Sequence, residues 1–152
     1  MSTPPESDRD RLSRNLAELL QELRVAQGGV QILFGFLLTV AFTGRYESAG
    51  ALVHGLHLLA VLLSAGAIAL LTATAAWHRM LFRQQQRVEI IRSANWMTLA
   101  GLTCLAGAMI ATLGLIADVV LGDGWALLVG VAAGLGFALL WFVMPYRRMA
   151  HH

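Results

Sequence analysis

The chain has 152 residues, of which 57% are hydrophobic and 13% are charged. A soluble domain averages about 25% charged residues, and here the apolar residues form long runs, so the composition excludes a soluble globular domain and favours an integral membrane protein. The length allows one domain at most. The net charge of +2 arises from arginines that flank the apolar runs, so we interpret it as a topology signal and expect no nucleic-acid partner.

The N-terminal part of the chain is polar. Residues 1–7 contain two prolines, and we expect them to be disordered. Over residues 8–24, leucines recur at spacings of three and four while charged side chains occupy the opposite face. This pattern predicts an amphipathic interfacial helix on the membrane or on a partner. No cleavable signal peptide is visible, so the first membrane helix should serve as the insertion signal.

Four long apolar segments follow, and we expect each to cross the membrane. Crossing a bilayer core of about 30 Å takes roughly 20 apolar residues. The predicted helices span about 25–43, 51–77, 94–121 and 125–145. The connection at 43–50 is short, that at 78–92 is long and basic, and LGDG at 121–124 predicts a tight turn. The fold class predicted is therefore all-α: an integral membrane four-helix bundle (25–145) with an N-terminal cytoplasmic amphipathic helix and a tail at 146–152. We leave His151 and His152 aside, since they are either native or a tag remnant.

The arginines predict the orientation. With both termini on one side, that side carries ten arginines and the opposite side carries only Arg45. The ten are Arg9, Arg11, Arg14, Arg24, Arg79, Arg83, Arg87, Arg92, Arg147 and Arg148. By the positive-inside rule, both termini should be cytoplasmic in a bacterial plasma membrane. The same imbalance argues against a transporter assembled from antiparallel copies.

A candidate polar face lies near the start of the first membrane segment. Arg24, Gln27 and Gln31 share one helix face at positions i, i+3 and i+7. Because lipid is a poor environment for amides, this face should point at other helices, either as structural glue or as a ligand or ion path. The pair Gly28-Gly29 predicts a hinge where the interfacial helix turns into the membrane span.

Ionisable residues inside membrane segments are few. His54, His57 and Asp118 fall at similar depth near the outer interface. Such residues either bond to headgroups and neighbours or form a proton or cation site. A structured metal site is the third alternative, but the spacing fixes no third ligand, so we assign no metal. The single cysteine, Cys104, reads as a small packing residue.

Two further patterns concern the membrane surface and helix packing. Arg79, Arg83 and Arg87 recur every four residues, which indicates either anchoring by snorkelling side chains or an anionic-lipid headgroup pocket. Gly130 and Gly134 form G-x-x-x-G in the fourth segment, which suits packing inside the bundle or a homo-oligomer or partner interface. No motif for a catalytic or cofactor site is present, so we predict a non-enzymatic protein without a cofactor.

Three stretches resemble a known family. They are NLAELLQELRVAQGGVQILFGFLLTVAF, HRMLFR at 78–83 and the WFVMPYRR end, and the resemblance covers about Asn15 to Arg148. The sequence is similar to a family of small actinobacterial multi-pass membrane proteins that is filed as a domain of unknown function. Some similar proteins carry an automatically assigned sodium:proton antiporter name. The resemblance implies a fold and a compartment.

Two functions remain open from the sequence. The first is a non-enzymatic accessory, scaffolding or assembly component in the lipid bilayer, packing with other membrane helices in a homo-oligomer or a larger membrane complex. The second is an oligomeric proton-linked monovalent cation transporter or channel. Known coupling sites place ionisable groups and broken helices near the bilayer midplane, and this chain offers no acid there, which favours the first.

Overall fold

A computed structural model of the chain describes the backbone of residues 8–81, 87–122, 124–144 and 147. Side chains are described for residues 21, 23–44, 46–74, 76, 96–122, 124–141, 143, 144 and 147. The regular elements in this part of the chain are α1 (Asp8–Val40), α2 (Gly44–Glu47), α3 (Ala51–Leu81), α4 (Arg87–Leu121), α5 (Trp125–Ala138) and the π-helix η1 (Leu139–Val143). All of them are helical, which confirms the predicted all-α class.

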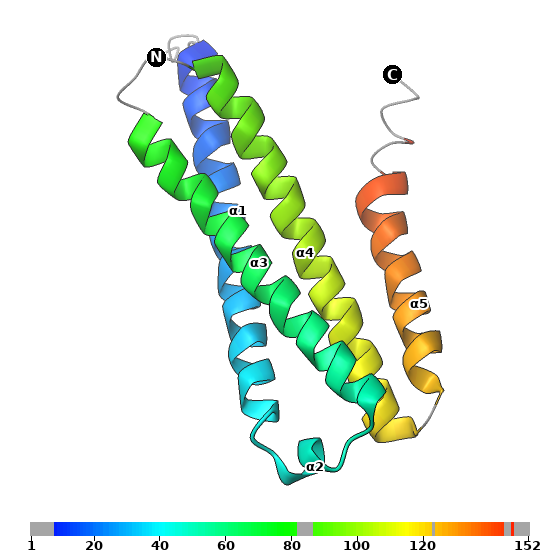
Figure 1. The fold of residues 1–152 in the computed structure, drawn as a ribbon. Helices are drawn as coiled ribbons and strands as arrows, with labels where there is room; N and C mark the ends of the chain where they lie inside the picture. The colour runs from blue at the N-terminus through cyan, green and yellow to red at the C-terminus, as the bar shows by residue number, and fades with distance from the viewer. Residues whose placement is uncertain (1–7, 82–86, 123, 145–146, 148–152) are drawn as a thin grey trace, which may run out of the picture.

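The long helices alternate in direction. Four helix ends lie at one end of the molecule (Figure 1). They are the N-terminal end of α1, the C-terminal end of α3, the N-terminal end of α4 and the C-terminal end of η1. The short helix α2 and the α4–α5 turn lie at the opposite end, which we call the α2 end (Figure 1). This alternation is what successive membrane crossings require.

The most extensive packing joins α3 to α4, and we call this contact the α3–α4 seam. The buried residues of α3 alternate at spacings of four and three: Val53, His57, Ala60, Ser64, Ala67, Leu71 and Thr74. That spacing is a seven-residue repeat, typical of helices that pack side by side at a small left-handed crossing angle. In α4, Gly101, Ala108 and Leu115 are buried at intervals of seven. The two repeats together explain why the α3–α4 seam runs along much of both helices.

Small residues let the two helices of the α3–α4 seam approach closely. A Cβ added at Gly101 would stand 2.9 Å from Cγ of Leu71, and one at Gly107 would stand 2.9 Å from Cδ1 of Leu63. A Cβ at Gly66 would lie 3.8 Å from Sγ of Cys104. Membrane helices associate mainly through such close packing, because lipid is as apolar as the side chains themselves.

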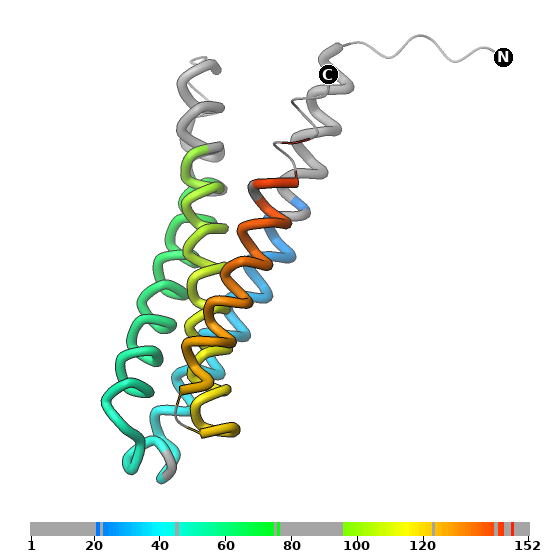
Figure 2. The backbone as a smooth tube through the Cα atoms, turned by 90° about the vertical axis from the view of Figure 1, so that its right-hand side faces the viewer, coloured from blue at the N-terminus to red at the C-terminus, as the bar shows by residue number. Residues whose placement is uncertain are grey.

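Helices α1 and α5 flank this pair. Leu37 of α1, Ala60 of α3 and Ala111 of α4 form one buried cluster. On the other side, α5 packs against α4 and diverges from it away from the turn, in both views (Figures 1 and 2). A closed four-helix bundle would bring α5 back against α1. Among the described residues, α1 packs mainly against α3 and α5 mainly against α4, so the closed bundle is not confirmed.

Three helices are long and apolar enough to cross a membrane. Their candidate spans are Leu23–Val40, Ala51–Thr74 and Trp96–Leu121. The fourth apolar stretch, Trp125–Trp141, is a shorter helix than the span predicted over 125–145. Its α-helical hydrogen bonding ends at Ala138 and continues as the single π turn η1. The sequence offers a reason, since Pro145 lacks the N–H that would reach the carbonyl of Trp141.

The predicted hinge at Gly28-Gly29 is wrong. Helix α1 continues without a break from Asp8 to Val40, so the predicted segments 8–24 and 25–43 belong to one helix. Glycine permits a bend but does not impose one, and its cost inside a helix is only about 1 kcal/mol. The side chains of residues 1–20 lie outside the described residues, and with them the amphipathic face of this helix.

The tight turn predicted at LGDG is confirmed. Gly122 and Gly124 have φ values of 96° and 97°, in the left-handed region that favours glycine. The Gly122 N–H donates to the Asp118 carbonyl at 3.0 Å and so ends α4. Helix α5 therefore begins directly beside the end of α4.

Candidate functional site

The predicted polar face lies on the membrane-crossing part of α1. Arg24 and Gln31 are exposed and Gln27 is half-buried, whereas Val30 and Leu37 are fully buried against the other helices. Arg24 and Gln31 thus point away from the rest of the chain, although we expected this face to point at other helices. The other helices of the same chain leave these two side chains uncovered.

The glycines of α1 lie open on that same side. A Cβ added at Gly28 or Gly35 would meet nothing within 4 Å. In the sequence, Arg24, Gly28, Gln31 and Gly35 alternate at spacings of four, three and four. We call these four residues the α1 outer stripe. Its spacing repeats that of the buried α3–α4 seam, but no helix among the described residues covers it.

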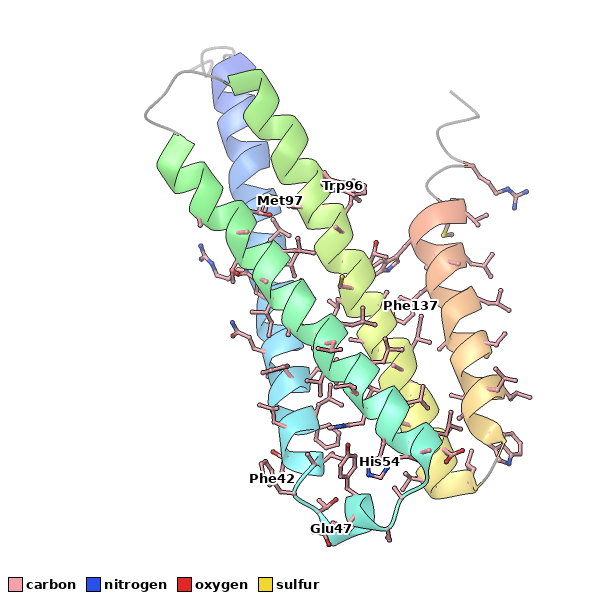
Figure 3. All side chains as sticks on the ribbon, in the orientation of Figure 1. Phe42, Glu47, His54, Trp96, Met97 and Phe137 are labelled. Carbon is pink, nitrogen blue, oxygen red and sulfur yellow. The ribbon has the colours of Figure 1, made fainter. Side chains whose placement is uncertain are left out.

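Two of the three predicted ionisable residues meet at the α2 end. The rings of His54 and His57 each contact the Tyr46 ring edge-on, at centroid distances of 4.4 and 4.8 Å. Figure 3 shows His54 and Glu47 at this end of the molecule, whereas Trp96 lies toward the opposite end of α4. Edge-on aromatic pairs of this kind are favourable, so Tyr46 holds the connection between α1 and α3 in place.

His57 also ties α3 to α1. Its Nε2–H donates to the Leu37 carbonyl at 2.8 Å, and its side chain is 6% exposed. A carbonyl can only accept, so Nε2 carries the proton in this bond. His54, by contrast, bonds to the residue that precedes its own helix, from Nδ1 to the Gly50 carbonyl at 3.1 Å. The geometry therefore gives His57 a structural role that joins two helices.

Asp118, the third predicted ionisable residue, lies on α4 near the α2 end of the molecule (Figure 1). On α4 it lies four residues beyond Gly114, whose added Cβ would contact Leu56 of α3 and the Ala126 carbonyl of α5. Continuing that antiparallel register brings Asp118 level with the first turn of α3. Its Oδ1 is buried without a hydrogen-bond partner, a condition that is rare in native proteins.

No metal centre is formed in the described part of the chain. Among these residues, no group of three His, Cys, Asp or Glu side chains could hold a metal ion. His54 and His57 have Tyr46 between them, and a phenol ring is no substitute for a third carboxylate or imidazole ligand. The cluster is an aromatic and hydrogen-bonded contact between helices.

The remaining candidates have different outcomes. The side chains of Arg79, Arg83 and Arg87 lie outside the described residues, so the anionic-lipid site stays a prediction. On α5, an added Cβ at Gly134 would lie 3.8 Å from Cδ1 of Ile110, while one at Gly130 would meet nothing within 4 Å. Of these two small residues of α5, therefore, Gly134 packs against α4 and Gly130 does not.

Three groups that lie in or near these helix contacts were not predicted from the sequence. Tyr46 lies in a short connection where no periodicity singles it out. The Leu37 carbonyl is a backbone group, and no side-chain pattern reveals it. Ser64 is fully buried in α3 with an Oγ that has no hydrogen-bond partner. Its place in the alternating repeat of α3 was the one signal in the sequence that could have found it.

Fold and site together define a class. This is an all-helical protein with three helices long and apolar enough to cross a membrane, and with a polar stripe on the outward side of the first. Such helices indicate a membrane-embedded protein.

The chain belongs to the family of unknown function DUF6328, which matches residues 5–145. The match covers nearly all of the stretch that carried the sequence resemblance, and it confirms an uncharacterised family. No curated protein and no solved structure matches the chain. The family brings no activity with it, so function must be argued from the residues themselves.

Proposed function

We propose that this protein is a non-enzymatic accessory or assembly component of a bacterial plasma membrane, which packs with other membrane helices through the outward side of α1. In this proposal α1, α3, α4 and the shorter α5–η1 segment all cross the bilayer. Both termini lie in the cytoplasm. The partners are the lipid bilayer and a homo-oligomer or larger membrane complex.

One observation carries the proposal, namely the exposure of Gln31 on a helix that is long and apolar enough to span a membrane. An amide facing hydrocarbon has no water with which to exchange hydrogen bonds, so it favours contact with another polar group. Only 11% of the α1 span is buried inside the chain, compared with 39% of the α4 span. A neighbouring helix from another polypeptide would supply the missing cover.

The charge pattern supports the orientation. Arginine-rich sequence accompanies the ends of α1, α3 and α4 that lie together in Figure 1, whereas the α2 end holds Arg45. An excess of arginine is typical of cytoplasmic loops. In this arrangement Glu47 on α2 faces the outside and Arg147 faces the cytoplasm. A membrane-impermeant thiol reagent should therefore label Glu47→Cys in intact cells, in a Cys104→Ala background, and Arg147→Cys only after the membrane is permeabilised.

An oligomeric proton-linked monovalent cation transporter or channel is the alternative. Asp118 favours it, because a buried carboxylate oxygen without a hydrogen bond is a candidate carrier of a proton or cation. Against it, the buried Thr74 and Thr112 hydroxyls donate to carbonyls of their own helices. Ser64 is the one other buried hydroxyl among the described residues, and the rest of the buried core there is made mostly of alanine, leucine and valine.

Two experiments separate these functions. Tagged protein extracted in mild detergent should co-purify with a membrane partner or further copies of itself, and Gln31→Leu should reduce that recovery. Ile32→Leu, at a neighbouring position that is 76% exposed, is the matched control and should leave recovery unchanged. Equal recovery from both variants would remove the main support for the proposal.

The second experiment is flux across a pH gradient in proteoliposomes. An accessory protein should show no cation-dependent proton movement, with or without Asp118→Asn. A flux that the wild-type chain supports and Asp118→Asn abolishes would establish the alternative instead.

A further inference from the structure

We propose that the partner of the α1 outer stripe is a second copy of this chain, lying parallel to the first, with Gln31 of each copy hydrogen-bonded to Gln31 of the other. This inference rests on the proposed function and names the partner of the same surface.

The chemistry of the amide selects its partner. A glutamine side chain carries one carbonyl acceptor and two N–H donors, so another glutamine satisfies both kinds of group at once. Within lipid, an unpaired polar group cannot form hydrogen bonds with water instead, so leaving it unpaired costs free energy. Thr39 already donates to the Gly35 carbonyl at 3.0 Å and needs no partner, and Gln27, one turn before Gln31, is half-buried, whereas Gln31 is exposed. Gln31 is therefore the exposed group on this side of α1 that needs both a hydrogen-bond donor and a hydrogen-bond acceptor from a partner.

The α1 outer stripe gives the helices room to meet. Gly28 precedes Gln31 by three residues and Gly35 follows it by four. Neither glycine has another part of the chain within 4 Å of an added Cβ. Small residues on both sides of a polar one let two membrane backbones approach closely enough for the polar side chains to bond. The alternating four and three spacing is the one that also runs along the buried side of α3, and it is typical of helices that cross at a shallow left-handed angle.

Topology makes a second copy the matching occupant. Every copy inserts with its arginine-rich ends on one side, so two copies lie parallel and present Gln31 at the same depth. A two-fold axis between them then pairs each residue of the α1 outer stripe with its own equivalent, as isologous interfaces do. Arg24 lies two turns, about 10 Å, toward the cytoplasmic end, where its long side chain reaches water instead of facing its equivalent.

The opposite edge of the molecule is a weaker candidate. On α5, Ala126 packs against Gly114 and Gly134 lies near Ile110, so its small residues already contact α4. No polar side chain stands among the described residues of that helix. Only the α1 outer stripe, of these two edges, combines open glycines with an amide.

Disulfide crosslinking in native membrane vesicles tests the inference. In a full-length Cys104→Ala background, Gly35→Cys should form a disulfide-linked dimer on mild oxidation, because a disulfide needs Cα atoms within about 7 Å. Phe36→Cys, one residue along and 52% exposed in the wild type, is the matched control and should stay monomeric. Equal crosslinking of the two would mean random collision and would overturn the inference.

A second measurement leaves both glycines intact. Energy transfer between donor- and acceptor-labelled copies in liposomes should show self-association, which Gln31→Leu weakens by about 3- to 30-fold for each interhelical hydrogen bond lost. Gln31→Asn should retain part of it. Unchanged energy transfer in Gln31→Leu overturns the inference. If Gln31→Leu instead releases a different membrane protein, the proposed function stands and the second copy is wrong; if it changes no association of any kind, both fail.

Discussion

The α3–α4 seam and the α1 outer stripe share a spacing and differ in what covers them. In the first, residues alternating by four and three are buried by a neighbouring helix of the same chain. In the second, the same alternation of small and polar residues faces outward, and a Cβ added at Gly28 or Gly35 would meet no other part of the described chain within 4 Å. The comparison teaches that the fold of one chain buries the α3–α4 seam, and we propose that the α1 outer stripe serves association with another chain. The following substitutions test that division.

The largest effect should come from emptying the α3–α4 seam. Leu71 is fully buried, so Leu71→Ala leaves a cavity that the two helices cannot easily close. Because lipid is as apolar as a leucine side chain, the substitution loses little free energy of transfer in a membrane. We therefore expect the free energy of unfolding to fall by about 2 kcal/mol, the low end of the range for Leu→Ala substitutions in protein cores. Reversible unfolding in mixed detergent micelles, followed by circular dichroism, measures it. Leu127→Ala, at a residue that is 75% exposed, should cost little, and an equal cost would contradict the division.

Overfilling the same seam should be nearly as harmful. Gly101→Val places atoms where Leu71 Cγ already stands 2.9 Å from an added Cβ. Overpacking of this kind costs about 1–3 kcal/mol. Gly130→Val provides the comparison, because an added Cβ there meets nothing within 4 Å. The unfolding midpoint should fall for the first variant and hold for the second; a fall in both would show that α5 packs more tightly than its geometry indicates.

The contact between α1 and α3 should contribute less than the α3–α4 seam to the free energy of unfolding. His57→Phe keeps the ring but removes the 2.8 Å bond to the Leu37 carbonyl. One such bond between membrane helices is worth about 0.6–2 kcal/mol, and the same unfolding experiment resolves a loss of that size. His54→Phe removes only a local bond to Gly50, just before α3, and should have the smaller effect. A larger loss for His54→Phe than for His57→Phe would contradict this, and would mean that the ring contacts with Tyr46 stabilise this end more than the His57 hydrogen bond does.

The smallest effect on folding is expected in the α1 outer stripe. Gly35→Ala adds a methyl group into open space and improves helix propensity by up to about 1 kcal/mol. The monomer should therefore unfold at the same midpoint or slightly later. Its self-association should nevertheless weaken, because the methyl group separates the two backbones. An earlier unfolding midpoint would show that this side of α1 is packed within the chain.

The helices themselves could be predicted from the sequence, because long apolar runs have few other solutions in a membrane protein. Their packing could not. In a uniformly apolar helix, the residues facing a neighbour and those facing lipid look alike, so the repeat through Ala60 and Ala67 was hidden among equally apolar residues such as Leu58 and Leu62. Polar residues were the exception, and Gln31 was found because an amide is conspicuous there.

One error has a physical cause. The hinge was predicted because Gly28-Gly29 stands where the chain changes from polar to apolar, but a continuous helix costs less than the loss of backbone hydrogen bonds at a break. The grouping of Asp118 with His54 and His57 rested on depth alone and stays a prediction. Depth follows from the rise per residue, whereas the direction of each side chain depends on which neighbours α3 and α4 choose.

The central claim is that Gln31 serves association and not the folding of a single chain. It is tested most directly by measuring both quantities on one preparation of Gln31→Leu in the same lipid. The account predicts an unfolding free energy within about 0.5 kcal/mol of wild type, as for substitutions away from packed sites, together with a clear loss of self-association. An unfolding free energy lowered by more than about 1 kcal/mol, with association unchanged, would place Gln31 inside the chain's own packing and contradict the account.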